Sequence, residues 1–473
     1  MENRTCLTGV HMNNDPIFQP IKFPHLEVKN RIFRSSISGR FDNEDGSGTQ
    51  TRINWEEKFA RGGVGAIITS FVPVTLGGRI MANYATIHSD NFVPFWKRVG
   101  QVVHRHDCKF IVQLSHSGRQ QDGPGIANQH RKVLSSTSRP ESLHGFPCQA
   151  MTRQEIKETV QAFADGARRA RQAGLDGVEL HGANGYLITQ FLSSGINNRR
   201  DEYGGSLENR ARFLREIVTA IRREVGHDFH LQVKVSAVDF NNVIPWERKG
   251  NKLEDTIEVC KWVEEDGANA VHISTGSLFP HPLNPPGDFS FDTIVNTYDT
   301  MIASGMYTLR NYFLFRYKVL RPIFYLLWFR MKWGKPVEGI GADYARAIKQ
   351  HVKIPVISTG GYQTASFIRR HLEEGYFDAV AIARPLIANN DLVQQWERGF
   401  DQPERPCTYC NKCLLNAPKN PLGCYELSRF DGDYEAMLKQ ILSVYGHSPD
   451  YWSGPLQAPA KEATDEPAFR ALA

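Results

Sequence analysis

Eight short apolar runs, each followed by an amphipathic segment, constrain the fold of this chain more than any other feature. Strands of a parallel sheet that is covered by helices have no polar face, so they are almost continuously apolar. The runs lie at residues 31–35, 64–70, 109–115, 176–181, 230–236, 269–275, 354–359 and 378–383. Helical periodicity occupies residues 153–172, 207–225, 253–266, 343–351 and 364–374. This alternation predicts an α/β fold, a (β/α)8 TIM barrel.

A doubly wound sheet is the alternative. It normally has fewer consecutive units and a glycine-rich dinucleotide turn, and no G-x-G-x-x-G follows any of the runs. One helix start is explicit: Ser206 is a predicted N-cap, with Asn209 at the position where a capping box prefers Glu or Gln.

We expect the barrel to occupy residues 15–400, with a long insertion after strand six at residues 276–341. A cysteine-bearing extension follows at 401–452, and a polar, proline-containing tail at 453–473 is expected to be flexible. Neither a signal peptide nor an apolar stretch of about 18 residues is found. Lys and Arg number 56 against 51 Asp and Glu, and this net charge of +5 does not indicate a nucleic-acid partner. Four clustered cysteines indicate thiolate ligation in a reducing compartment, so we expect a cytoplasmic protein.

Polar residues follow several of the predicted strands, where a TIM barrel carries its functional site. They are Gln113, His116 and Arg119 after the third strand, His181, Asn184 and Tyr186 after the fourth, Lys234 at the end of the fifth, Gly360 and Gly361 after the seventh, and Arg384 after the eighth. Their agreement predicts one site at the carboxyl-terminal end of the barrel.

The group His181, Asn184 and Tyr186 carries the most chemical information. His181 and Asn184 are three residues apart beside a glycine-rich turn, so both can donate to one carbonyl oxygen and stabilise a developing enolate. Tyr186 can supply a proton from its phenol. A single histidine after a strand is more often structural, but the triplet followed by NRRDEYGGSLENR favours a catalytic site.

With these residues the sequence resembles the old yellow enzyme family of FMN-dependent ene-reductases, over roughly residues 15–430. The motifs that carry the resemblance are KNRI (29–32), QLSHSGR (113–119), HGANGYL (181–187), NNRRDEYGGSLENR (197–210), STGG (358–361) and AIARPL (381–386). The resemblance implies a (β/α)8 barrel with non-covalent FMN at its mouth. It also implies hydride transfer from NAD(P)H to the flavin and then to the β-carbon of an α,β-unsaturated carbonyl compound.

The resemblance also implies roles for individual residues. His181 and Asn184 would bind the substrate carbonyl oxygen, and Tyr186 would protonate the α-carbon. The flavin-binding residues that it implies are Ser36, Ile37, Ser38, Gln113, Lys234, Gly360, Gly361, Ala383 and Arg384.

Within that flavin-binding set, Gln113 would hydrogen-bond the pyrimidine edge of the ring. Gly361 and Arg384 would hold the phosphate through backbone N–H groups and a guanidinium fork. Ser38 stands where relatives carry Thr or Cys. Lys234 stands where many relatives place Arg, so it keeps the positive charge but loses the planar fork. The sequence therefore does not predict the redox potential of the flavin.

Four cysteines, Cys407, Cys410, Cys413 and Cys424, form a C-x2-C-x2-C-x10-C motif. Four thiolates at this spacing can ligate a [4Fe–4S] cluster or a structural zinc, and free thiols are the third alternative. The motif resembles the cluster loop of the 2,4-dienoyl-CoA reductase branch of the family. That branch typically has three residues, not two, between its second and third cysteines.

The insertion contains an unusual segment, residues 306–335, with ten aromatic and seven basic side chains and no acidic one. Its apolar core is interrupted by Arg321 and Pro322 and is too short to span a bilayer. One interpretation is an interfacial segment on an anionic membrane surface; the other is a lid or a subunit contact. In either case it would overhang the flavin and admit a hydrophobic substrate. Because this segment carries +7, the rest of the chain has a net charge of −2.

The sequence therefore predicts an FMN-dependent oxidoreductase that reduces the C=C bond of an α,β-unsaturated carbonyl substrate with NAD(P)H. One alternative is a flavin-dependent dehydrogenase or demethylase that passes electrons to an iron–sulfur cluster. Another is a membrane-docked FMN-binding protein without turnover, although the complete His181, Asn184 and Tyr186 triplet argues against it.

Overall fold

The computed structural model describes residues 14–121, 132–240, 250–278, 281–302 and 304–446. The tail expected at 453–473 lies outside these residues, as does the end of the extension.

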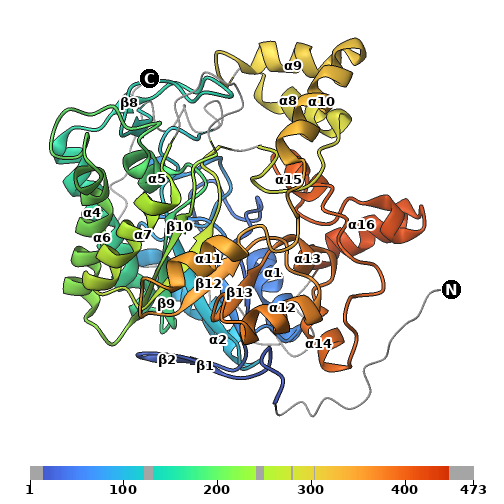
Figure 1. The fold of residues 1–473 in the computed structure, drawn as a ribbon, viewed down its shortest axis with the longest axis horizontal. Helices are drawn as coiled ribbons and strands as arrows, with labels where there is room; N and C mark the ends of the chain where they lie inside the picture. The colour runs from blue at the N-terminus through green and yellow to red at the C-terminus, as the bar shows by residue number, and fades with distance from the viewer. Residues whose placement is uncertain (1–13, 122–131, 241–249, 279–280, 303, 447–473) are drawn as a thin grey trace, which may run out of the picture.

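Eight parallel strands close into one barrel, which confirms the predicted fold (Figure 1). They are β3 (Ile32–Arg34), β4 (Ala66–Ile68), β6 (Lys109–Ser115), β9 (Gly177–Gly182), β10 (His230–Ser236), β11 (Ala270–Ser274), β12 (Val356–Thr359) and β13 (Ala379–Ile382). Each pairs with the next in chain order, and β13 pairs with β3 to close the ring. The short β5 (Val72–Pro73) adds to the end of β6. The eight strands coincide with the eight apolar runs.

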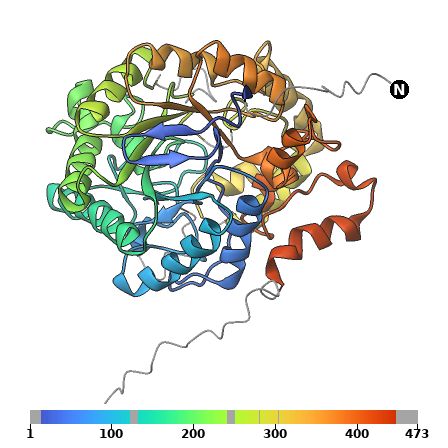
Figure 2. The same ribbon diagram turned by 90° about the horizontal axis from the view of Figure 1, so that it is seen from below.

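Helices surround the barrel, as Figure 2 shows. They are α1 (Gln50–Arg61), α2 (Val93–His104), α4 (Arg153–Gln172), α5 (Leu187–Leu192), α6 (Leu207–Val225), α7 (Leu253–Glu265), α11 (Ala342–Lys349), α12 (Ala365–Glu373), α13 (Arg384–Ala388) and α14 (Leu392–Glu397). The predicted cap of α6 is confirmed, because the side chain of Ser206 accepts a hydrogen bond from the backbone N–H of Asn209.

The amino-terminal end of the barrel is closed by a hairpin of β1 (Ile21–Phe23) and β2 (Leu26–Val28). Phe23 and Val28 pack there against Phe33 and Ile111 from the barrel strands. Because this end is filled with apolar side chains, the open end of the barrel is the carboxyl-terminal one.

The insertion forms a layer of three helices, α8 (Phe291–Met301), α9 (Thr308–Arg316) and α10 (Arg321–Lys332), which Figure 1 shows at the end of the molecule away from the β1–β2 hairpin. An aromatic cluster that includes Phe289, Phe291 and Tyr298 holds the layer together. None of the helices in the described ranges is both long and apolar enough to cross a membrane.

Two other segments hold this helical layer in place. The first lies between β7 (Leu134–Ser135) and β8 (Gln149–Ala150), where the side chain of Asn311 donates to the carbonyl of Leu143 at 2.7 Å. The second is the cysteine-bearing extension, with α15 (Lys412–Asn416) and α16 (Tyr434–Leu442). There the backbone N–H of Asp288 donates to the carbonyl of Tyr409 at 3.0 Å.

Candidate active site

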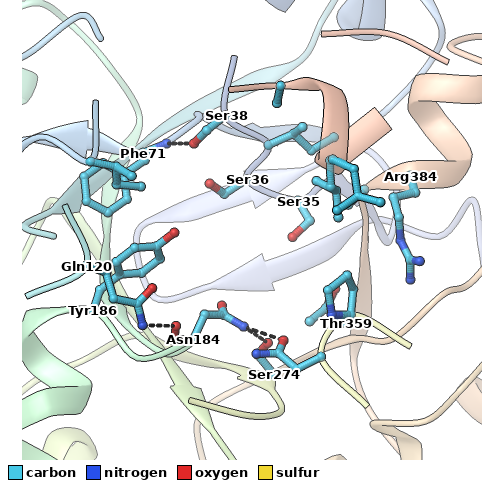
Figure 3. A pocket seen from close by; sticks show the side chains of 18 of the residues that line it. Ser35, Ser36, Ser38, Phe71, Gln120, Asn184, Tyr186, Ser274, Thr359 and Arg384 are labelled. Atoms are coloured by element: carbon cyan, nitrogen blue, oxygen red, sulfur yellow. Dashed lines mark hydrogen bonds between the residues drawn. The ribbon is translucent and has the colours of Figure 1, made fainter. Parts of the chain in front are cut away.

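A cavity of about 370 Å³ opens at the carboxyl-terminal end of the barrel (Figure 3). Its floor comes from the ends of the strands, and its roof includes Ile294 and Tyr298 of α8 and Leu414 of α15. Every residue predicted as catalytic or flavin-binding lines this cavity, with the exception of Gln113. The lining set comprises Ser36, Ile37, Ser38, His181, Asn184, Tyr186, Lys234, Gly360, Gly361, Ala383 and Arg384.

Gln113 lies just below the cavity, inside the barrel. Its side-chain amide donates to Glu179 at 2.8 Å, and its carbonyl oxygen accepts from the hydroxyl of Ser36 at 2.8 Å. Glu179 is fully buried and also accepts from Gln232 at 2.5 Å and from His272 at 2.8 Å. Gln113 is therefore held one layer beneath the cavity and contacts its lining through Ser36.

The buried carboxylate of Glu179 compensates positive charge at the floor of the cavity. Burial alone would raise its pKa, but His272, Lys234 and the hydrogen bond from Gln113 lower it to about 2. Burial lowers the pKa of Lys234, and the attraction of Glu179 opposes that shift. The register of the sheet pairs Lys234 with His181 on one side and with His272 on the other. The cation therefore lies directly beside the predicted catalytic histidine.

The imidazole of His181 is buried and neutral. Burial, and then the charge of Lys234, lower the pKa of the imidazole well below its ordinary value. Its Nδ1 atom is buried and has no hydrogen-bond partner among the residues that the structure describes. An unsatisfied buried ring nitrogen is uncommon in a folded protein and marks this imidazole as unusual.

Asn184 follows β9 in a tight turn, with φ of 60°, and Gly185 follows at 85°. Asparagine and glycine are the residues that adopt this left-handed conformation most readily, which explains the GANG sequence. The amide of Asn184 donates to Asn284 of the insertion at 3.0 Å and reaches Ser274 at 3.5 Å. Its donor is thus partly engaged by the insertion rather than fully free toward the cavity.

Tyr186 stands on the opposite side of the cavity from Arg384, and its hydroxyl points into the open centre (Figure 3). Its ring packs edge-on against Phe71 at 4.9 Å and against His181 at 4.7 Å. Burial, together with the nearby Tyr84, raises the pKa of the phenol, so the hydroxyl keeps its proton.

Arg384 lies between the cavity and the cysteine extension. Its guanidinium donates to the carbonyl of Pro286 at 2.7 Å and to the side chain of Asn411 at 2.6 Å, and it lies 5.4 Å from the ring centre of Tyr409. One terminal nitrogen of the guanidinium therefore bonds within the protein. The predicted phosphate fork had assumed that both terminal nitrogens are available to a ligand.

The four predicted cysteines, Cys407, Cys410, Cys413 and Cys424, converge on one small pocket behind Arg384. Burial raises the pKa of Cys407 to about 11, and the same cause raises the pKa of Cys413. Arg429 donates to the sulfur of Cys424 at 3.1 Å. Over the described ranges, no three His, Cys, Asp or Glu side chains lie close enough to hold a single metal ion.

Sequence reasoning missed several residues of the cavity. Phe71 packs between Tyr84 and Tyr186, and Glu141 and His144, whose Oε2 and Nδ1 atoms lie 3.1 Å apart, line another part of the wall. Glu179 was also missed, although a charged residue within an otherwise apolar strand is a signal that sequence analysis can use.

Several known proteins are similar to this chain in sequence or in fold. The profile of the NADH:flavin oxidoreductase / NADH oxidase family matches residues 16–310. A NADH oxidase from Thermoanaerobacter brockii is 32% identical over 448 residues, covering 92% of this chain and 60% of that protein. A NADPH dehydrogenase from Geobacillus sp. (strain WCH70) is 37% identical over 266 residues, covering 56% of this chain and 74% of that protein. The solved structure of a 2-naphthoyl-CoA reductase complex has a TM-score of 0.69 at 24% identity, covering 89% of this chain and 58% of that one. The chain thus spans only about three fifths of the NADH oxidase.

Proposed function

The chain belongs to the NADH:flavin oxidoreductase / NADH oxidase family, that of old yellow enzyme, and we propose that it is an FMN-dependent oxidoreductase using NAD(P)H. We propose further that it reduces the C=C bond of an α,β-unsaturated carbonyl substrate. The observation that carries this proposal is that His181, Asn184 and Tyr186 line one cavity beside Lys234.

The donor set around the cavity fits FMN. Lys234 supplies a cation at the floor, Ser36 and Ser38 line the wall, and the backbone at Gly360 and Gly361 follows β12 at the other end. Gln113, Ile37, Ala383 and Arg384 complete the proposed binding set. When bound, FMN supplies hydride transfer between the nicotinamide and the substrate.

The residues of the chain then bind and polarise the substrate. His181, neutral at pH 7, and Asn184 donate to the carbonyl oxygen, which stabilises negative charge that develops there. For Asn184 this requires that its amide is shared with Asn284 or released from it. Tyr186 keeps its proton and delivers it to the α-carbon. The apolar side chains in the roof of α8 and α15 suit a hydrophobic substrate.

The test is an anaerobic titration of the purified protein with NADPH, followed by addition of 2-cyclohexenone. We expect FMN to be released on denaturation, its visible absorbance to bleach with NADPH, and the absorbance to return with the enone. A flavin that NADPH cannot bleach would overturn the proposed reaction, and a colourless protein that does not take up added FMN would overturn the cofactor assignment.

A second candidate function, dehydrogenation with electron transfer to an iron–sulfur cluster, is favoured by the pocket that the four cysteines share. If it is correct, purified protein contains iron and acid-labile sulfide, and Cys413→Ser loses both. Cys148→Ser is the matched control, because Cys148 is a free cysteine outside this pocket. Zinc without sulfide, or no metal at all, would exclude the cluster.

A further inference from the structure

The outer surface of the insertion is apolar although it faces solvent. We define it by six side chains on and between α9 and α10: Leu309, Phe313, Val319, Ile323, Leu326 and Trp333. The exposed fractions are 80% for Val319, 72% for Trp333 and 66% for Leu326. Large apolar side chains that gather on the exposed surface of a folded protein are typical of an interaction site.

The inner face of α10 already has its partners. Trp328 packs on Phe289 with ring centres 4.6 Å apart, and Phe324 lies 6.2 Å from Phe291. Arg321 on the same side forms an ion pair with Asp292 at 2.8 Å. The outer residues Ile323 and Leu326, and the inner Phe324 and Trp328, thus make α10 apolar on both faces. A helix of this kind is normally covered on both sides.

The charge of the segment limits what can cover the outer surface. Lys318, Arg330 and Lys335 are exposed and have no acidic partner in the described part of the chain. No acidic residue occurs between residues 306 and 335. A second copy of the chain joined face to face would place this basic set against itself, because a two-fold interface pairs the same patch of both subunits. The surface therefore requires a partner that is both negatively charged and apolar.

A membrane surface that contains anionic lipids has both properties. α10 has 12 residues, so it is about 18 Å long and too short to cross the hydrocarbon core. Helices that present Trp, Phe and Leu together with basic residues lie in the headgroup region instead. Tyr317 and Trp333, both exposed at helix ends, are the residue types that favour this interface.

We propose that the outer surface docks the protein on a bilayer that contains anionic lipids. The outer surface and the roof of the cavity belong to one helical layer, because Ile294 and Tyr298 of α8 line that roof. The bilayer would then lie over this roof, and the substrate would be a lipid-soluble enone. This last step rests on the proposed function, whereas docking itself does not.

The experiment is flotation of the full chain with vesicles of phosphatidylcholine alone and with added phosphatidylglycerol. We expect binding to the mixed vesicles, weakened about 100-fold in the variant Lys318→Gln/Arg330→Gln/Lys335→Gln, since each basic residue near the surface contributes about 5-fold. The variant Ile323→Gln/Leu326→Gln/Trp333→Gln should lose binding by at least about 100-fold. Phe400→Gln is the matched control, because Phe400 is 55% exposed and lies outside the outer surface.

Three outcomes would overturn the proposal. They are no binding to the mixed vesicles, equal binding by the wild type and both triple variants, and a stable dimer in light scattering that the apolar triple variant converts to monomer. FMN content and bleaching by NADPH are measured on the same samples. A variant that keeps both but loses vesicle binding supports docking, and a wild-type protein that binds vesicles without flavin chemistry refutes the proposed function alone.

Discussion

Replacing Tyr186 by Phe tests the proposed acid with little disturbance of the protein. The phenylalanine ring preserves the contacts with Phe71 and His181 at 4.9 and 4.7 Å. The described residues provide no hydrogen-bond partner for the phenol, so its removal orphans no protein group, and we expect a loss of stability below about 1 kcal/mol.

The expected effect on catalysis is much larger. A positioned general acid contributes about 100- to 10,000-fold to a rate. Burial raises the pKa of Tyr186, so the phenol is a weaker acid than in water, and we expect an effect near the lower limit. A 100-fold loss corresponds to about 2.7 kcal/mol in the activation barrier. Because the phenol stays protonated between about pH 6 and 9, Tyr186 itself should introduce no pH dependence in that range.

The assay separates the two half-reactions in an anaerobic stopped-flow instrument. Flavin bleaching by NADPH should keep its wild-type rate in Tyr186→Phe, while the return of absorbance with 2-cyclohexenone should slow about 100-fold. Tyr84→Phe is the control, because Tyr84 is a buried phenol in the same wall whose hydroxyl bonds to Ser38. Reoxidation at the wild-type rate, or equal slowing of both half-reactions, would refute the assignment of Tyr186 as the acid.

Three further predictions concern other parts of the chain. Gly361→Ala should lower FMN affinity and the melting temperature more than the control Gly375→Ala. Both glycines have a positive φ, of 73° and 71°, but only at Gly361 would a Cβ meet a backbone oxygen, 2.6 Å away. Glu179→Gln should flatten the dependence of unfolding free energy on pH, measured with urea. The pKa of this carboxyl falls to about 2, so its stabilising contribution is complete above about pH 4.5 and is lost as the pH falls toward 2. Phe291→Ala should destabilise the insertion by about 3–5 kcal/mol and expose it to limited proteolysis, with barrel fragments remaining protected.

The barrel could be predicted from the sequence because the patterns that mark its strands and helices each lie within a few neighbouring residues. Continuous apolar runs mark strands that are buried on both faces, and Ser206 marks the start of α6 at the residue where the structure places it. The lining of the cavity was also predictable, since residues after successive strands must meet at one end of a parallel barrel.

What could not be predicted depends on contacts between distant segments. The cavity roof combines Tyr298 with Leu414, which are separated by more than a hundred residues and carry no shared motif. The engagement of Arg384 with Asn411 depends on how the extension folds back over the barrel. Helical periodicity likewise does not tell which face of α10 is inward, because both faces are apolar.

Arg384 forms part of the wall of two cavities at once, one lined by His181 and Tyr186 and the other by the four cysteines. Its guanidinium cannot move toward one without changing its distance to the other. If both cavities are filled and Arg384 contacts both ligands, occupancy of the cysteine pocket and the affinity of the other cavity for its ligand would be thermodynamically linked, and the linkage would be reciprocal. If filling the thiol pocket tightens the binding of a phosphate group by some factor, binding of that group must stabilise the filled thiol pocket by the same factor.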